Sequence, residues 1–393
     1  MKETRLSRMQ VLMLLDNPFV SDVRVDKEAA SLSKYGASVT VACSMENDLP
    51  YKEIRNGYTI IRLIEDGYNA PLRKSYKEYI SRTADKIEQL EFNILHCHDF
   101  YMLSIGNELK KRNPSIYLIY DAHEYLKGWP FYKTSKGINK FKGRLVWNQL
   151  VRKEKNEIKK ADKVITITSA IAERIRENSA LLISPMVIGN YPMKTDLEVS
   201  NGYFHEKYKL PKDELVLIHS GTIYHTDFQL KTLFDIVTSI TNLILVFVGD
   251  RPRFFDIKQI VGKDAELSKK IYFHDYPKTQ NETVNLLGAA DFGLLHVNDS
   301  WEAHKIGFSN RFAEYIMAEL PVVATPQEFT FKLNNELECC AFYHENNSVE
   351  LKNAIQKITA NKMNFKKNAM AAREKLDWKL ESQKLIDLYK SLS

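Results

Sequence analysis

The clearest pattern in the chain is an alternation of short apolar runs with amphipathic stretches. The run "VLMLL" (Val11–Leu15) is continuously apolar, which is typical of a buried parallel strand. The helical pattern "VRVDKEAASLSKYG" follows and ends at Gly36, and the strand pattern "SVTVAC" comes next. This order predicts a βαβ unit, in which the helix covers a parallel sheet.

Similar units recur in two series. The first series continues with "NILHCHD", "IYLIYDAHEY" and "ADKVITITSAIAERIRE", and the second consists of "ELVLIHSGT", "LILVFVGD", "KKIYFHDY", "DFGLLHV" and "PVVAT". The turn-rich stretch "SPMVIGNYPMKTDLEVSNG" between them predicts a linker. We therefore predict an α/β fold with two doubly wound Rossmann-like domains that face a cleft. The predicted boundaries are 1–190 for the first domain, 191–202 for the linker and 203–375 for the second domain.

Length and composition fit two globular α/β domains. The chain has 393 residues, of which 44% are hydrophobic and 27% charged, so one core would be too small for it. The net charge of +6 is mild and does not argue for nucleic acid. The four cysteines show no spacing typical of disulfides or zinc, no apolar run has the length of a membrane span, and no signal segment is evident. We expect the protein to work in the cytoplasm.

The segment "SNRFAEYIMAELPVVAT" carries the most chemistry. Ser309 and Asn310 are good N-cap residues, so the segment predicts a helix start whose free N–H groups attract an anion. Arg311 adds a cation that can hold a phosphate through two bonds. Glu314 lies one turn further along, where it could accept hydrogen bonds from a ribose-like diol. Together these residues suit a nucleotide diphosphate sugar, although an ordinary αβ unit with a surface Glu would show a similar pattern.

Several common nucleotide motifs do not occur in the chain. There is no GxG dinucleotide motif, no GxxxxGK phosphate loop, and no DxD metal anchor. These gaps disfavour dehydrogenases and kinases. We predict a metal-independent site, with no cofactor other than the nucleotide diphosphate sugar itself.

The same segment resembles the donor-binding helix of retaining glycosyltransferases of the GT-B fold, family 4, in which a carboxylate precedes a run of the type "YxxAxxPVVAT". The resemblance extends along nearly the whole chain. The C-terminal "DWKLESQKLIDLYKSL" is similar to the family's last helix, which crosses back onto the N-terminal domain, so the resemblance assigns residues 376–393 to that helix.

In the C-terminal half, the resemblance implies a donor site. "HSGTIYHTDF" is similar to the family's glycine loop, although Thr222 stands where the family usually has Arg, and no Lys occurs before Lys231. A second departure is Ile306, at a position where the family's fuller signature has Glu. The donor-binding residues that the resemblance and the local pattern imply are Gly221, Thr222, Arg251, Tyr276, Phe308, Ser309, Asn310, Arg311 and Glu314.

In the N-terminal half, the motif "YDAHEY" places His123 at a strand end, where the family carries a histidine that reaches the donor sugar from the opposite domain. The resemblance therefore makes His123 and Glu314 the expected catalytic residues. Asp22, Arg24, Asp99 and Glu124 are the expected acceptor-side residues. An N-cap role for Asp22 and a surface position for Arg24 are the alternative.

The motif "HCHDF" holds two histidines that could suggest a metal. We expect the His96 and His98 side chains to point to opposite faces of their strand, and on that ground we predict no metal site.

The resulting hypothesis is a retaining hexosyltransferase that moves a sugar from a nucleotide diphosphate sugar, with UDP favoured over GDP, onto a cell-surface glycan or a lipid-linked precursor. The leaving phosphate would accept the acceptor's proton, so that no protein nucleophile is needed. Two alternatives remain open. One is a sugar-nucleotide epimerase of the same architecture, and the other is a catalytically silent sugar-nucleotide-binding partner, since the first Glu and the loop Lys are missing.

The segment Lys127–Lys163 is basic and rich in aromatic residues. Such a face suits peripheral contact with an anionic membrane, which a lipid-linked acceptor would require. We therefore predict contact with the inner membrane face. A solvated helix with a few core aromatics is the alternative.

Overall fold

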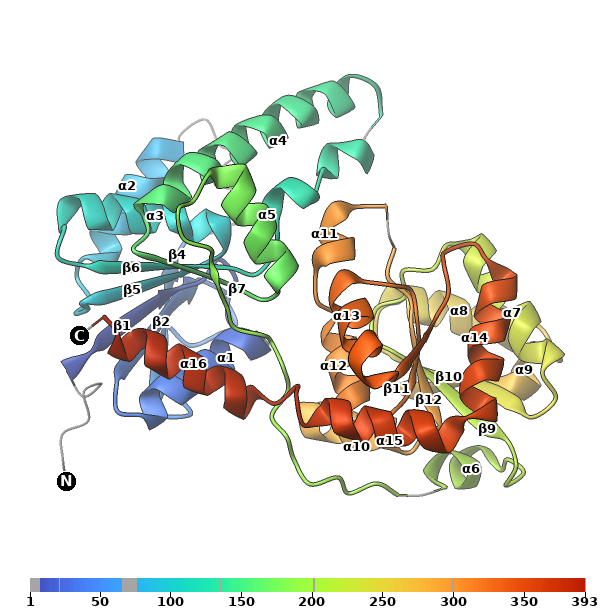
Figure 1. The fold of residues 1–393 in the computed structure, drawn as a ribbon. Helices are drawn as coiled ribbons and strands as arrows, with labels where there is room; N and C mark the ends of the chain where they lie inside the picture. Colours follow the sequence, from blue (N-terminus) through green and yellow to red (C-terminus); the bar gives the residue numbers. More distant parts are fainter. Residues whose placement is uncertain are drawn as a thin grey trace. The chain divides into compact units, whose positions relative to one another are not determined.

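The structure is a computed structural model that describes residues 8–20, 22–65, 76–134, 136–200, 202–298 and 300–392. It divides into two compact units (Figure 1). Unit 1 consists of Met1–Asn190 and Leu380–Ser393, and unit 2 consists of Tyr191–Lys379.

The sheet of unit 1 has eight strands in the order β3-β4-β2-β1-β5-β6-β7-β8. All neighbouring strands are parallel except for the antiparallel pair of β3 and β4. The strands are β1 (Gln10–Leu14), β2 (Ser38–Ser44), β3 (Lys52–Arg55), β4 (Tyr58–Ile64), β5 (Ile94–His98), β6 (Tyr117–Ala122), β7 (Lys163–Thr166) and β8 (Met186–Val187).

The helices of unit 1 cover both faces of this sheet, with α2, α3 and α4 on one face and α1 and α16 on the other (Figure 1). They are α1 (Val23–Lys34), α2 (Tyr76–Ile87), α3 (Asp99–Arg112), α4 (Gly137–Glu157), α5 (Ser169–Ser179) and α16 (Trp378–Lys390), with short 3-10 turns η3 (Leu126–Gly128), η4 (Phe131–Thr134) and η5 (Ile158–Lys160).

Helix α16 returns to unit 1 from the C-terminal end of the chain. The hydroxyl of Tyr389 lies 2.9 Å from Nδ1 of His96 in β5, and the carboxylate of Glu381 accepts a hydrogen bond from the backbone N–H of Gly189 at 2.7 Å. The predicted return of the last helix to the N-terminal unit is confirmed.

The sheet of unit 2 has six parallel strands in the order β11-β10-β9-β12-β13-β14. In chain order this is 3-2-1-4-5-6, the order of a Rossmann sheet, and it reverses between β9 and β12. The strands are β9 (Leu215–Ser220), β10 (Leu243–Gly249), β11 (Ile271–Asp275), β12 (Phe292–Leu295), β13 (Val322–Ala324) and β14 (Cys340–Phe342).

Helices pack on both faces of the second sheet over two apolar clusters. Val246 and Tyr315 belong to one cluster, and Leu245 and Phe254 belong to the other, as expected when neighbouring residues of a strand face opposite ways. The helices are α6 (Tyr203–Tyr208), α7 (Asp227–Ser239), α8 (Pro252–Gly262), α9 (Leu267–Lys270), α10 (Gln280–Gly288), α11 (Glu302–Ile306), α12 (Asn310–Met317), α13 (Glu328–Leu337), α14 (Ser348–Ala360) and α15 (Lys362–Arg373).

The predicted α/β fold with two Rossmann-like, parallel-sheet domains is confirmed. The apolar runs form the expected strands, and Gly36, with φ of 101°, follows α1 in the left-handed region that glycine favours. The prediction did not include the antiparallel hairpin of β3 and β4 or the short strands β8 and β14, which have two and three residues.

Close packing of α3 on the sheet depends on Gly106. A Cβ atom at this position would overlap Cys97 Sγ and would lie 2.9 Å from Leu118 Cδ1. We expect Gly106→Ala to lower the free energy of unfolding by about 1–3 kcal/mol, measured by urea denaturation, because overpacked cores strain their neighbours. Gly262→Ala is the control, since no atom lies within 4 Å of that Cβ position. Equal stability of the two variants would contradict this packing.

Candidate functional site

Two of the predicted donor-binding segments lie on either side of the point where the strand order of unit 2 reverses. The loop at Gly221 follows β9, and the helix α12 lies in the connection that follows β12. In open α/β sheets, ligands bind beyond the carboxyl ends of the strands at such a point. The topology of unit 2 therefore places both segments where a ligand is expected.

Gly221 brings the loop close to two other predicted donor residues. Its φ of +76° lies in the left-handed region, which a side chain would strain. A Cβ atom there would lie 3.5 Å from Arg311 Nη2 and 4.0 Å from Tyr276 Cε2. The structure thus assembles Gly221, Tyr276 and Arg311 within unit 2.

The guanidinium of Arg311 is fastened to this loop by two hydrogen bonds. Nη2 donates to the backbone oxygen of Thr222 at 2.6 Å, and Nη1 donates to Nε2 of His219 at 3.1 Å. Burial and the nearby Arg311 cation lower the pKa of His219 well below its usual value, so its neutral ring can accept this bond. Since a guanidinium carries five N–H hydrogens, three remain for a ligand.

The start of α12 has the predicted cap. The Ser309 side chain accepts a hydrogen bond from the backbone N–H of Phe312 at 3.4 Å, and Asn310 is exposed in the first turn. The ring of Phe308 is less available to a ligand than expected, because it packs against Tyr191 and Phe329 at centroid distances of 5.3 and 4.9 Å. Its backbone stays next to the helix start.

Tyr315, which was not predicted as a site residue, fixes α12 at the point where the strand order reverses. The hydroxyl of Tyr315 accepts a hydrogen bond from Ser220 N at 3.0 Å and lies 3.1 Å from the carbonyl oxygens of Ile218 and Leu294. It therefore touches both β9 and β12. Next to it in the chain, the half-buried Glu314 approaches Tyr276, whose pKa is raised by burial and by this carboxylate.

Arg251 occupies a different environment from Arg311. It is the N-cap residue of α8, its side chain is 73% exposed, and its nearest acidic group is Asp250 at 3.7 Å. Among the described residues, no hydrogen bond or ion pair joins it to the Gly221 loop. The neighbouring Arg253 forms an ion pair with Asp227 at the start of α7. The geometry therefore favours Arg311 over Arg251 as the cation of the site.

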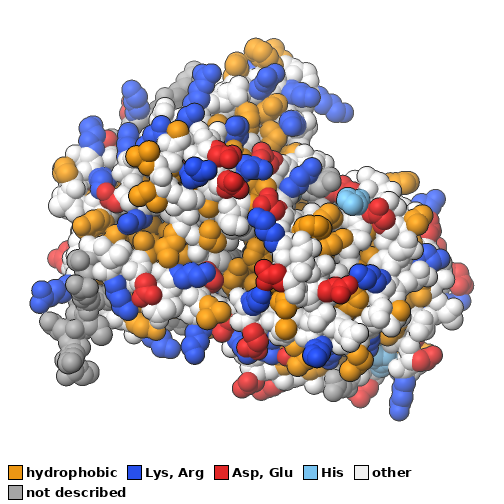
Figure 2. Space-filling model, in the orientation of Figure 1, with side chains coloured by type: hydrophobic (Ala, Val, Ile, Leu, Met, Phe, Trp, Pro, Cys, Tyr) orange, Lys and Arg blue, Asp and Glu red, His pale blue; other side chains and the backbone are white. Residues whose placement is uncertain are grey.

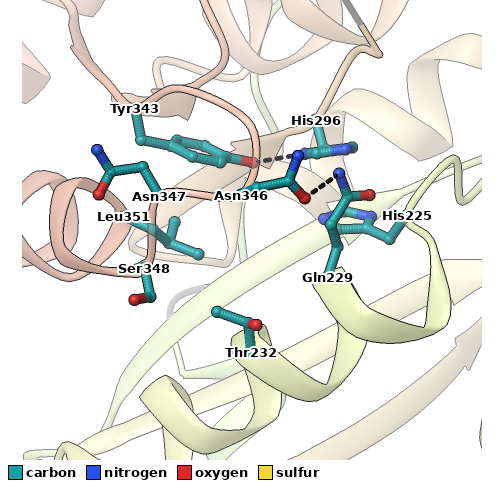
Figure 3. Close-up of a pocket in the computed structure, with 9 residues that line it drawn as sticks. All are labelled: His225, Gln229, Thr232, His296, Tyr343, Asn346, Asn347, Ser348 and Leu351. Atoms are coloured by element: carbon teal, nitrogen blue, oxygen red, sulfur yellow. Dashed lines mark hydrogen bonds between the residues drawn. The ribbon is translucent and has the colours of Figure 1, made fainter.

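A pocket lined mainly by polar residues lies next to the glycine loop (Figure 3). His225 stacks on His296 at a centroid distance of 3.9 Å and meets His219, the partner of Arg311, at 5.5 Å. Hydrogen bonds join His296 to Tyr343 at 3.0 Å and Gln229 to Asn346 at 3.1 Å. The pocket is lined by His225, Gln229, Thr232, His296, Tyr343, Asn346, Asn347, Ser348 and Leu351. These residues come from the end of the glycine loop, from α7 and α14, and from the segments that follow β12 and β14.

In unit 1, the acceptor-side residues have unequal environments. Asp22 is the N-cap of α1, and its Oδ1 accepts a hydrogen bond from Val25 N at 3.2 Å. Arg24 is not a surface residue, because only 3% of its side chain is exposed. Its Nε and Nη2 donate to the two Asp121 oxygens at 2.8 and 3.0 Å. Arg24 therefore orients Asp121 and does not face solvent.

His123 lies between two carboxylates. Its Nδ1 is 3.3 Å from Asp99 Oδ2, and its Nε2 is 3.2 Å from Asp121 Oδ2 and from His98 Nδ1. Although burial opposes it, Asp99 and then Asp121 raise the pKa of His123 to about 10. Both ring nitrogens are therefore engaged inside the protein, and the imidazole is held charged.

Asp99 has an unusual backbone conformation and a carboxyl group with a raised pKa. Its φ of 59° is in the left-handed region, at the junction of β5 and α3, and its Oδ1 accepts a hydrogen bond from His123 N at 3.2 Å. Burial, together with Asp16 and Glu124, raises the pKa of Asp99 to about 7. Backbone strain of this kind clusters at functional sites. Glu124 itself is exposed beside this carboxylate.

The predicted orientation of His96 and His98 is wrong. Their rings stack at a centroid distance of 4.4 Å, because residues two apart in a strand point to the same face. Together with Glu28 and Asp121 they form a buried group of four side chains whose ligand atoms all lie within 4.8 Å of one another. The reason for excluding a metal at this position therefore fails.

The structure thus forms two groups of predicted residues. In unit 2 it brings together Gly221, Thr222, Tyr276, Arg311 and Glu314, and in unit 1 it brings together Arg24, Asp99 and His123. Sequence reasoning missed His219, Tyr315 and Asp121, which position members of these groups. All three lie within the quoted motifs, so their place at strand ends or in the donor helix was the available signal.

Comparison with known proteins finds a resemblance to glycosyltransferases. Residues 22–182 match the sequence profile of Glycosyltransferase Family 4. This match lies in the N-terminal part of the chain, which is therefore similar to family 4 glycosyltransferases. A search of curated proteins found no match.

Solved structures with the GT-B fold resemble the chain over nearly its whole length. Sucrose-phosphate synthase from Thermosynechococcus elongatus has a TM-score of 0.72 at 16% identity, with 98% of this chain and 99% of that chain covered. A trehalose-6-phosphate protein from E. coli, bound with UDP-2-fluoro glucose, has a TM-score of 0.68 at 14% identity, with 97% and 99% covered. HepE from Anabaena, in complex with UDP-glucose, has a TM-score of 0.68 at 13% identity, with 97% and 99% covered.

Proposed function

We propose that this protein is a retaining glycosyltransferase that moves a sugar from a UDP-sugar onto a cell-surface glycan or lipid-linked precursor. The observation that supports it most is the Arg311 guanidinium fastened to the Gly221 loop at the strand-order reversal of unit 2. UDP is the preferred nucleotide in this proposal because structures of similar fold hold UDP-glucose or its fluoro analogue.

Within unit 2, each part of the donor has a proposed contact. The backbone N–H groups at Gly221 and at the start of α12, together with Arg311, face the diphosphate, since helix starts and guanidinium groups favour anions. The half-buried ring of Tyr276 stacks on the base, and Glu314 accepts hydrogen bonds from the ribose diol. In this proposal, these hydrogen-bond donors balance the negative charge of the diphosphate without a metal ion.

The proposed chemistry needs no protein nucleophile. The acceptor hydroxyl forms its bond to the anomeric carbon on the face from which the phosphate leaves, and the phosphate oxygen takes the hydroxyl proton. Arg311 and the backbone N–H groups stabilise the negative charge that develops on the diphosphate. Positioned hydrogen-bond donors of this kind act most strongly where water is excluded.

In unit 1, we propose that His123 contacts the transferred sugar and that Asp22, Asp99 and Glu124 line the acceptor side. Because both ring nitrogens of His123 already face carboxylates, its role would be to present a fixed charged ring and backbone rather than to exchange a proton. Arg24 acts through Asp121, and so it is a positioning residue.

Removal of Arg311 tests the donor site. Charged hydrogen bonds contribute roughly 1.5–3 kcal/mol, so Arg311→Ala should weaken UDP binding by about tenfold or more while uridine affinity changes little. Calorimetry with both ligands measures the difference. Arg251→Ala is the matched control, because its exposed side chain should change UDP affinity far less. If Arg311→Ala binds UDP as the wild type does, the diphosphate site lies elsewhere.

Removal of His123 tests the role of unit 1 in turnover. His123→Ala should reduce the rate of sugar transfer, or of slow donor hydrolysis, while the dissociation constant of UDP stays close to that of the wild type, because the nucleotide contacts lie in unit 2. Both are measured on one preparation of the variant. Equal loss of UDP binding and turnover would contradict the assignment, and formation of an epimeric UDP-sugar by the wild type would favour an epimerase.

The first half of α4 offers the proposed membrane surface. Ile138, Phe141 and Leu145 are 70%, 64% and 49% exposed and follow helical spacing, so they share one stripe. Exposed cations flank this stripe, namely Lys136, Lys140, Lys142 and Arg144. Figure 2 shows basic and hydrophobic side chains side by side over this part of unit 1. None of the helices in the described residues has the length and hydropathy to span a membrane.

This stripe predicts binding to anionic lipid. Vesicles that contain phosphatidylserine should co-sediment with the protein at moderate salt, whereas neutral vesicles should not, because each basic residue near the surface adds about 1 kcal/mol. Phe141→Ser combined with Lys140→Ser should weaken this binding. Phe331→Ser, at a half-exposed phenylalanine of unit 2, is the control. Equal sedimentation with both vesicle types would favour a merely solvated helix.

A further inference from the structure

The buried group formed by Glu28, His96, His98 and Asp121 has the composition of a metal site. Glu28 comes from α1, the two histidines from β5 and Asp121 from β6. Each of the four offers one ligand atom, and these atoms lie within 4.8 Å of one another. All four side chains are fully buried, with 0% of their surface exposed.

Several polar atoms of this group have no hydrogen-bond partner among the described residues. They are Nε2 of His96, Nε2 of His98 and Oε2 of Glu28, whose other oxygen, Oε1, forms an ion pair with Arg24 at 3.1 Å. His96 Nε2 and Glu28 Oε2 lie 3.9 Å apart, too far for a hydrogen bond but close enough to share an ion. Buried polar atoms without partners are costly, and an ion or an ordered water is the usual explanation for them.

The other nitrogen of each histidine is already held. His96 Nδ1 lies 2.9 Å from the Tyr389 hydroxyl, and His98 Nδ1 lies 3.4 Å from Asp121 Oδ2. Metal-binding histidines nearly always show this arrangement, because a partner on one nitrogen fixes the ring and leaves the lone pair of the other for the metal. In both His96 and His98, Nε2 is the nitrogen without a hydrogen-bond partner among the described residues.

Charged residues of both signs surround the group. The carboxylates of Glu28 and Asp121 face a single guanidinium, that of Arg24, which lies 3.1 Å from Glu28 and 2.8 Å from Asp121. His123 and Asp99, which flank the group, offset each other.

We propose that Glu28, His96 and His98 bind one zinc ion, with Asp121 orienting His98 and Tyr389 orienting His96. Two histidines and one carboxylate form a known zinc ligand set, with bonds of about 2.0–2.2 Å. Tetrahedral ligand atoms stand roughly 3.4 Å apart. The ligand atoms here lie within 4.8 Å of one another, so a pair of them must approach by at most roughly 1.4 Å to bind the ion. The ion joins α1 to β5 and, through Tyr389, to α16, and this role does not depend on the proposed transfer activity.

Metal content is the direct test. The full chain is expressed in zinc-supplemented medium, purified without chelators, and measured by inductively coupled plasma mass spectrometry. About one zinc per chain is expected for the wild type, and a small fraction of that for His98→Gln and for Glu28→Gln, since each change removes a ligand. His344→Gln is the matched control, because His344 is an exposed histidine paired with Glu350, and this variant should keep its zinc. Equal zinc in all variants would overturn the assignment.

A second measurement keeps the test valid if a ligand variant fails to fold. The wild type is unfolded with a chelator, freed of metal, and refolded with zinc, with cobalt or with neither. Refolding with cobalt should give visible absorption bands of a nitrogen- and oxygen-bound ion, and refolding with zinc should raise the midpoint of thermal unfolding. If no bands form and the midpoints are equal, a water molecule occupies the group and the zinc site is refuted.

Discussion

The strand order of the two sheets is the constraint on which the rest of the structure depends. In a doubly wound parallel sheet, the connections that follow the two central strands leave toward opposite faces, so their loops diverge at the carboxyl edge. In unit 2 these strands are β9 and β12, and in unit 1 they are β1 and β5. The donor loop, the start of α12, the start of α1 and Asp99 all follow these strands. Their placement results from topology rather than from local sequence.

Side chains then fix what the topology places. In unit 2, one tyrosine hydroxyl joins α12 to β9 and β12, and one neutral histidine holds the arginine at the glycine loop. In the proposed donor site, this arrangement would compensate for the Arg and Lys that the Gly221 loop lacks. The proposed cation, Arg311, comes from α12, which follows β12, instead of from the loop itself.

Unit 1 uses buried charge in the same way. Arg24 and Asp121 form a buried, two-bond ion pair, and Asp121 also faces His98 and His123. Removal of one partner from such a pair leaves an uncompensated charge, which typically costs about 3–5 kcal/mol. The network therefore holds His123 in one orientation at the edge of the sheet. Since Tyr389 contacts His96 beside it, the last helix of the chain is part of the same packed group.

Features that depend on neighbouring residues were predictable from the sequence. Continuous apolar runs identified the main strands of both sheets, because a strand buried on both faces has no polar positions. Ser309 as the N-cap of α12 and Gly36 after α1 follow from local backbone chemistry. The family resemblance added the order of the domains and the return of the last helix.

Features that depend on residues far apart in the chain were decided only by the tertiary structure. The burial of Arg24 depends on Asp121, which lies 97 residues away, and the anchor of Arg311 depends on His219, which lies 92 residues away. The sequence grouped Arg251 with Arg311 among the expected donor residues, but the Arg251 side chain is exposed, because its own loop does not determine which way the side chain turns. The two histidines of β5 share a face by strand geometry, but the glutamate that meets them comes from another helix. Sequence patterns encode the elements, whereas charge pairs and ligand sets arise only when the elements pack.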